Sequence, residues 1–360
     1  QRSLNPARKI YHTMAAEHRL FLSINFIRSR QNLYALQRKL EPGLQPRGIY
    51  SSKIQTMKRN AGNPFRPRYL ASWIGLGFLW ALSLIPMRIL YPVGTVIGDL
   101  LRTLVSSRRR IAERNLELCM PHKSKVEIQQ LVKENFRNIA RMALYTGTIW
   151  WAPKDKLLSL VTVKNQHLLT EILETGQGAV LIAPHMVGLE LGGIFLSLRF
   201  DGISIYQYSH NPVFDRAMLK ARQRFGSKLF ERKSNLKGLI RAIQQGKPCY
   251  YLPDQDPGPR RALFAPFFGI STATWPVLGK LSKLGRAKAL TCATYLKPDG
   301  KGFEIVFGEP LKDFPSGNDE TDTTAMNAVI ENCITQAPDQ YLWVHKRFKT
   351  RPAGEPGFYK

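Results

Sequence analysis

The stretch Gly178-Ala-Val-Leu-Ile-Ala183-Pro184-His185, followed by a helical pattern over 189–198, decides the fold class of this chain. A short continuous apolar run is typical of a strand that is buried on both faces of a parallel sheet. Further strands are predicted at 203–208, 249–252, 287–295 and 303–307, and further helices at 214–225, 236–245 and 321–336. Strands that alternate with helices predict an α/β fold, with a mostly parallel central sheet and helices on both faces.

His185 and Glu190 follow this strand at a spacing of five residues. On one continuous helix that spacing would turn the two side chains about 140° apart, so they could not touch. They can meet if His185 lies in the loop at the carboxyl end of the strand and Glu190 lies in the first turns of the next helix. Open α/β sheets bind ligands at that edge. We therefore predict a site there.

A histidine beside a carboxylate suits general base catalysis. Neutral imidazole, with a pKa of about 6.5, can take a proton from a hydroxyl nucleophile. A carboxylate on the other ring nitrogen would fix the tautomer and stabilise the imidazolium. The nucleophile would belong to the substrate, because no GxSxG elbow precedes the pair. The residues equally allow a core histidine that a nearby carboxylate satisfies.

The charge balance is strongly basic. Lys and Arg number 53 against 26 Asp and Glu, a formal net charge of +27. Such a surface suits nucleic acid, an anionic membrane, or acidic carriers and substrates. A basic membrane-associated nucleic-acid-binding protein is the alternative to an enzyme, although no zinc-finger, RRM or KH signature is present. The four cysteines form no CxxC pair, so we expect neither a disulfide framework nor a metal site.

The N-terminal third differs from the rest of the chain. Residues 1–56 are rich in Arg and Lys, and we predict a basic extension that is non-native or disordered, with translation starting at Met57. Residues 69–87 contain no charged side chain and approach the ~20 residues that cross a bilayer. We predict a membrane-anchoring region over 57–110, with a buried core helix as the alternative, and an α/β domain over 111–360.

Six ordered motifs carry a resemblance to a known family. His-x-x-x-x-Glu after an apolar strand is similar to the HX4D/E signature of glycerolipid acyltransferases. The chain as a whole resembles one branch of them, the late (secondary lauroyl and myristoyl) acyltransferases of lipid A biosynthesis. The other motifs are RNLELC (114–119), NPVFD (211–215), LPDQD (252–256), QYLW (340–343) and RFKTRP (347–352).

The resemblance implies an enzyme of the bacterial inner membrane, single-pass or monotopic, with its active site facing the cytoplasm. It would transfer a fatty acyl chain from acyl carrier protein to a hydroxyl of an anionic lipid A precursor, without a cofactor. The motifs lean partly to the lauroyl and partly to the myristoyl branch, so the acyl chain length stays open. A lysophospholipid or glycerol-phosphate acyltransferase is the related alternative.

The resemblance also implies roles for single residues. His185 would be the base and Glu190 its orienting partner, and Arg222 would lie near the developing oxyanion. Arg224, Asn211 and Asp256 are carried over as substrate-binding residues, with a charged helix face as the alternative for the two arginines.

From its own residues, the turn that contains Asp254 and Asp256 has a structural interpretation. Because prolines and a glycine flank both side chains, we expect them to bond to nearby backbone or to Arg260 and Arg261.

Overall fold

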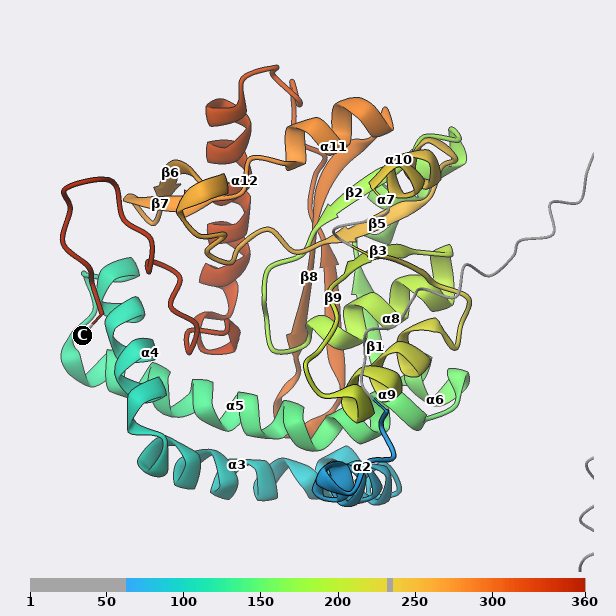
Figure 1. Ribbon diagram of the computed structural model, residues 1–360, viewed down its shortest axis with the longest axis vertical. Helices are drawn as coiled ribbons and strands as arrows, with labels where there is room; N and C mark the ends of the chain where they lie inside the picture. Colours follow the sequence, from blue (N-terminus) through green and yellow to red (C-terminus); the bar gives the residue numbers. More distant parts are fainter. Residues whose placement is uncertain (1–62, 232–235, 360) are drawn as a thin grey trace, which may run out of the picture. The chain divides into compact units, whose positions relative to one another are not determined.

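The computed structural model describes residues 63–231 and 236–359 (Figure 1). The extension predicted over 1–56 and the start predicted at Met57 lie outside these residues. Residues 61–360 form one compact unit, to which the sheet and all the helices described below belong.

A seven-stranded sheet forms the centre of this unit, with strand order β1-β9-β8-β2-β5-β3-β4 (Figure 1). Five of its six pairings are parallel, and β8 and β9 pair antiparallel. The predicted mostly parallel sheet is confirmed. The strands are β1 (Val161–Lys164), β2 (Ala179–Ile182), β3 (Ile203–Tyr206), β4 (Lys228–Glu231), β5 (Pro248–Tyr251), β8 (Lys288–Leu296) and β9 (Phe303–Phe307).

Helices cover both faces of the sheet. Side chains alternate between the two faces along each strand, so a continuously apolar strand presents apolar side chains that must be buried on both faces. Val180 and Ile182 of β2 pack against α10 (Leu236–Gln244), α11 (Leu278–Gly285) and α12 (Asp319–Gln336). Leu181 of the same strand packs on the other face, against α7 (Gln166–Glu174) and α8 (Leu189–Phe200). Every residue of β2 is buried, as its continuous apolar run predicted.

The sequence pattern missed three pieces of β-structure: β1, β4 and a separate hairpin of β6 (Leu263–Phe267) and β7 (Ile270–Thr274). Pro266 lies within β6 and obscures the strand pattern, since proline cannot donate a ladder hydrogen bond. The turn of the hairpin is formed by Phe268 and Gly269, with φ of 49° and 75°. Two successive left-handed residues are what a tight hairpin turn requires.

The uncharged stretch over 69–87 does not form one helix. It divides into α2 (Leu70–Leu82) and the start of α3 (Met87–Leu104), with Pro86 as the N-cap of α3. Proline lacks an N–H and disfavours helical backbone in the residue before it, so the helix is interrupted there. The 13 residues of α2 span about 20 Å, less than the ~30 Å of a bilayer core.

Within residues 63–231 and 236–359, no single helix is both long and apolar enough to cross a bilayer. One bent pair meets the length and composition requirements together: α3 and α4 (Ser106–Cys119), at 95° to each other.

The two sides of α3 have different surroundings. One side packs closely on α5 (Lys125–Trp151) through Gly94 and Gly98 (Figure 1). A Cβ at Gly98 would lie only 2.4 Å from the Cα of Arg137, so only glycine allows this approach. The other side exposes a regular apolar stripe of Ile89, Val93, Val96, Leu100 and Leu104.

Of the sixteen large apolar side chains exposed in the described part of the chain, thirteen lie between residues 65 and 104. The exposed apolar surface is therefore concentrated on α2, α3 and the turns beside them.

Candidate active site

His185 lies in the loop between β2 and α8, and Glu190 lies in the first turn of α8. Both positions confirm the predicted geometry. The two side chains line one cavity of about 440 Å³ at the carboxyl ends of β2, β3 and β5. Arg222, from α9 (Pro212–Gln223), lines the same cavity. Much of the remaining wall is apolar, formed by Leu189, Leu196, Ile203, Ile205, Met218 and Leu229.

The carboxylate that contacts His185 is Asp254. Nδ1 of His185 lies 2.5 Å from Oδ1 of Asp254, and the backbone N–H of His185 donates to Oδ2 at 2.7 Å. The predicted hydrogen bond between His185 and Glu190 is not formed. Of the two expected kinds of partner, Asp254 has a backbone N–H, that of His185, and in the described part of the chain it makes no ion pair with Arg260 or Arg261.

The register of the sheet explains this pairing. Strands β2 and β5 are parallel neighbours, and Ile182 pairs with Tyr251 at their carboxyl ends. His185 and Asp254 each come three residues after this pair. Both chains leave the sheet at the same edge, so the two side chains meet although 69 positions separate them.

The environment of Asp254 favours the charged carboxylate. Burial by itself would raise the pKa of this carboxyl group, but the charge and the hydrogen bonds of His185 hold the pKa below its ordinary value. A carboxylate accepts only, so Nδ1 of the neutral imidazole carries the proton that it shares with Asp254. Nε2 is then the ring nitrogen that can accept a proton from a substrate.

Glu190 has different partners. Nε of Arg222 donates to Oε1 at 3.0 Å and Nη2 donates to Oε2 at 2.5 Å, and the indole N–H of Trp150 donates to Oε1 at 3.1 Å. Burial would lower the pKa of Arg222, but the adjacent Glu190 carboxylate raises it. The guanidinium is thus charged and held in one orientation at the cavity wall.

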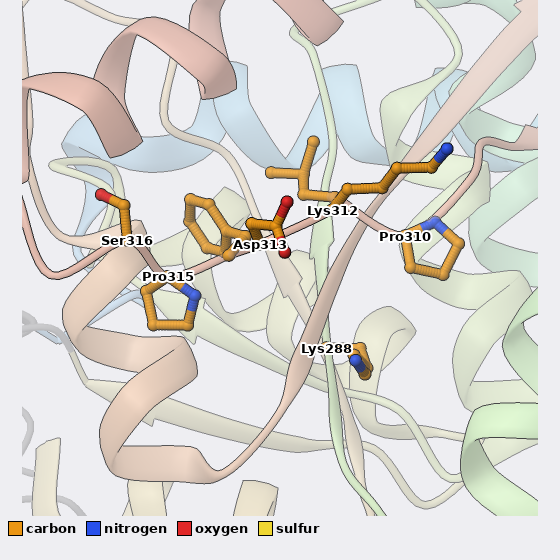
Figure 2. Close-up of a pocket in the computed structure, with 8 residues that line it drawn as sticks. Lys288, Pro310, Lys312, Asp313, Pro315 and Ser316 are labelled. Atoms are coloured by element: carbon orange, nitrogen blue, oxygen red, sulfur yellow. The ribbon is translucent and has the colours of Figure 1, made fainter.

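Lys288 and residues 310–316 line a different cavity, of about 710 Å³ (Figure 2). Lys288 begins β8 and is in register with Ala179 at the start of β2. This cavity therefore lies at the amino ends of β2 and β8, on the edge opposite to His185. Parallel sheets of this kind bind ligands at the carboxyl edge, which makes the cavity at His185 the candidate active site.

Comparison with protein families shows which family the chain belongs to. A family model described as bacterial lipid A biosynthesis acyltransferase matches residues 61–350. The chain belongs to this family. Membership confirms the resemblance that the six motifs carry, and it makes the chain an acyltransferase of lipid A biosynthesis.

Three curated relatives, all from Escherichia coli (strain K12), show the extent of the similarity. The lipid A biosynthesis lauroyltransferase is 34% identical over 298 residues, which cover 81% of this chain and 96% of the relative. The palmitoleoyltransferase is 34% identical over 295 residues, 81% of this chain and 95% of the relative. The myristoyltransferase is 28% identical over 295 residues, 82% of this chain and 91% of the relative.

Two of the residues carried over from the family motifs do not line the cavity at His185. Asn211 caps α9: its side-chain oxygen accepts from the N–H groups of Val213 and Phe214, and its amide donates to Ser72 at 2.7 Å. Arg224 donates to the carbonyl of Ile149 at 3.0 Å and lines a separate cavity beside α2. Both side chains thus have structural contacts, and their predicted contacts with substrate stay predictions.

Asp256 does line the cavity, within the predicted turn. It accepts from the N–H of Gly258 at 2.7 Å and from the N–H and hydroxyl of Thr350 at 2.6 and 2.9 Å. Asp256 therefore connects this turn to the C-terminal segment, and it makes no ion pair with Arg260 or Arg261 in the described part of the chain.

The C-terminal segment around 340–345 forms the wall on the other side of His185. The N–H of Leu342 donates to the carbonyl of His185 at 3.0 Å, and Tyr341 forms a β-bridge with Met186. The buried amide of Asn115 holds this segment by donating to the carbonyls of Trp343 and His345, at 2.6 and 2.8 Å. Asn115 belongs to the RNLELC motif and Trp343 to the QYLW motif. The sequence contains both motifs, but their spacing does not predict that these two residues are in contact.

Proposed function

We propose that the chain transfers a fatty acyl group from the thioester of an acyl carrier protein to a hydroxyl group of a phosphorylated lipid A precursor. The observation that supports this most directly is the His185–Asp254 pair, which opens on a partly apolar cavity in a member of this acyltransferase family. The apolar wall suits an acyl chain, and the pair suits the activation of a hydroxyl.

In the proposed reaction His185 is the general base. Its Nε2 takes the proton of the acceptor hydroxyl while that oxygen attacks the thioester carbonyl, and Asp254 stabilises the imidazolium. Negative charge develops on the carbonyl oxygen, and the Arg222 guanidinium, held by Glu190, is the cation on the cavity wall that can stabilise it. The tetrahedral intermediate then collapses. The C–S bond breaks, the thiolate takes the proton from His185, and the ester remains on the acceptor.

The net charge of +27 supports the same substrates. An acyl carrier protein is acidic and a phosphorylated lipid is anionic, so both are attracted to a basic protein surface. The field of such a surface raises the encounter rate with either partner.

We propose further that the enzyme lies on the cytoplasmic side of the inner membrane and docks with the exposed apolar stripe of α3 together with α2. An amphipathic helix in the plane of the interface buries one apolar face and needs no full span. Flotation of the protein with anionic lipid vesicles checks this placement. Replacement of Val96 and Leu100 by Asp should reduce the vesicle-bound fraction, and an unchanged fraction would contradict the placement.

The catalytic proposal is tested with His185→Ala in the full chain. Loss of a general base should lower the transfer rate by about 100- to 10,000-fold, measured with acyl carrier protein thioester and a lipid A precursor. His122→Ala is the matched control, because His122 is exposed in the turn before α5. Undiminished transfer by His185→Ala would refute the general-base role.

A further inference from the structure

His185 separates two cavities of different character. The first is the partly apolar cavity described above. The second, of about 540 Å³, lies between the turn at 254–259 and the C-terminal segment at 341–350. His185 and Asp256 line both. We propose that the second cavity binds a phosphate ester group of a substrate while the first holds the acyl chain. This inference rests on the proposed function.

Cations dominate the wall of the second cavity. The cationic side chains are Arg108, Lys346, Arg347 and Lys349, and the carboxylates are Asp254 and Asp256. Within residues 63–231 and 236–359, none of these four cations forms an ion pair with a carboxylate. Arg108 donates to the carbonyl of Val344, and the Lys346 ammonium lies 5.5 Å from the ring centre of Tyr359. Their positive charges are therefore available to an anionic ligand.

The two carboxylates have their hydrogen bonds satisfied by the protein itself. Asp254 is 1% exposed and accepts twice from His185. Asp256 accepts from Gly258 and from Thr350. Among the described residues neither carboxylate makes an ion pair with Arg108, Lys346, Arg347 or Lys349, so these four cations outnumber the carboxylates without being paired to them.

Arg347 adds a fixed positive charge beneath the exposed lysines. It is 3% exposed, and its guanidinium donates to the carbonyl of Ala273 and the hydroxyl of Thr274, which are neutral acceptors. Its Nε has no hydrogen-bond partner among the described residues. Burial lowers the pKa of Arg347 in spite of the nearby charges of Tyr341, Asp254 and Asp256, and an anion bound in the cavity would offset that cost. This favours a phosphate group over a neutral ligand.

The first cavity has the opposite character. Among its described lining residues the cationic side chain of Arg222 is paired with Glu190, and much of the rest of the wall is apolar. An acyl chain bound there and a phosphate bound in the second cavity would bring the reacting atoms to His185, at the junction. The arrangement separates the apolar acyl chain of the substrates from their anionic phosphate.

Two substrates can supply the phosphate ester. The acyl carrier protein holds its acyl group on a phosphopantetheine arm, and the lipid acceptor carries phosphate on its sugar. The shared chemistry is a phosphate ester within reach of the reacting carbonyl or hydroxyl, and two matched substrate pairs tell the sources apart.

The test uses the full chain in detergent with both Lys346 and Lys349 replaced by Ala. KM is measured for acyl-phosphopantetheine against acyl-pantetheine, and for the phosphorylated acceptor against the same acceptor after phosphatase treatment. We expect the KM for the phosphorylated substrate of one pair to rise roughly tenfold, because two partly exposed charge contacts are lost. The KM for the phosphate-free substrate and kcat should stay unchanged. Lys154→Ala with Lys156→Ala, on the exposed side of α6 (Lys154–Ser159), removes the same charge elsewhere and should leave every KM unchanged.

The pair that responds identifies the source of the phosphate. No response in either pair overturns the inference, provided that the wild-type enzyme transfers acyl groups. Calorimetric titration with inorganic pyrophosphate needs no turnover and keeps the two proposals separate. Weaker binding of pyrophosphate by the double variant is expected, and equal affinity overturns the phosphate site even if transfer by the wild type is not observed.

Discussion

The strand-end loops and the α8–α9 helix pair each bring one carboxylate close to His185, and the two carboxylates differ in their partners. Asp254, in the loop after β5, bonds to the histidine itself. Glu190, in the first turn of α8, bonds to Arg222 and Trp150. The carboxylate that is nearer in sequence is therefore not the one that bonds to His185. Adjacent parallel strands determine the contact, because they end at the same edge of the sheet.

The largest effect is expected for Asp254→Asn. The Asn oxygen can still accept from the backbone N–H of His185, but its NH₂ group would face Nδ1 and impose the tautomer with the proton on Nε2. That tautomer cannot act as the base, so kcat should fall by about 100- to 10,000-fold. Steady-state kinetics checks this, with a thermal unfolding scan to show that the variant folds. If kcat falls less in Asp254→Asn than in Glu190→Gln, Glu190 and not Asp254 contributes more to the function of His185.

The same variant tests the pH dependence of stability. Because the folded-state pKa of Asp254 is below its ordinary value of about 3.8, its contribution to stability is complete above that pH. The contribution is lost as the pH falls through the lower folded-state pKa. The wild-type protein should therefore lose more thermal stability than Asp254→Asn when the pH is lowered below 3.8. Equal losses would show that the carboxylate is not charged and bonded as described.

A smaller effect is expected for Glu190→Gln. The amide keeps the shape and an oxygen for Trp150, but it no longer neutralises or fully orients Arg222. Loss of a charged hydrogen bond should lower kcat/KM by about 10- to 100-fold. The pH dependence of kcat/KM should keep its shape, because His185 retains Asp254. A changed profile would assign Glu190 to the base after all.

The smallest effect is expected for Trp150→Phe. This change removes only the indole N–H that donates to Glu190 at 3.1 Å and keeps a buried aromatic ring. One neutral donor contributes about 1 kcal/mol, so kcat/KM should fall by roughly fivefold. An effect as large as that of Glu190→Gln would show that the indole, and not Arg222, controls the position of the carboxylate.

Some predictions failed for reasons that lie in single residues. Pro86 divides the uncharged stretch of 69–87 into two helices, although the composition alone favoured one. Pro266 obscured β6, and the Phe268-Gly269 turn became visible as a hairpin only from its two positive φ angles. Asn211 is the N-cap of α9, and this local role leaves its predicted contact with substrate a prediction.

Local sequence was sufficient for the buried strand over 178–183, the helix after it, and the position of His185 in the loop between them. These features follow from apolar runs, helical periodicity and Pro184, all of which act over a few residues. The strand order β8-β2-β5 decided the rest. It brings Asp254 to His185 across 69 positions, and the long-range hydrogen bonds of Asn115 bring the C-terminal segment to the same edge. Such contacts depend on which strands become neighbours, and spacing along the chain does not carry that information.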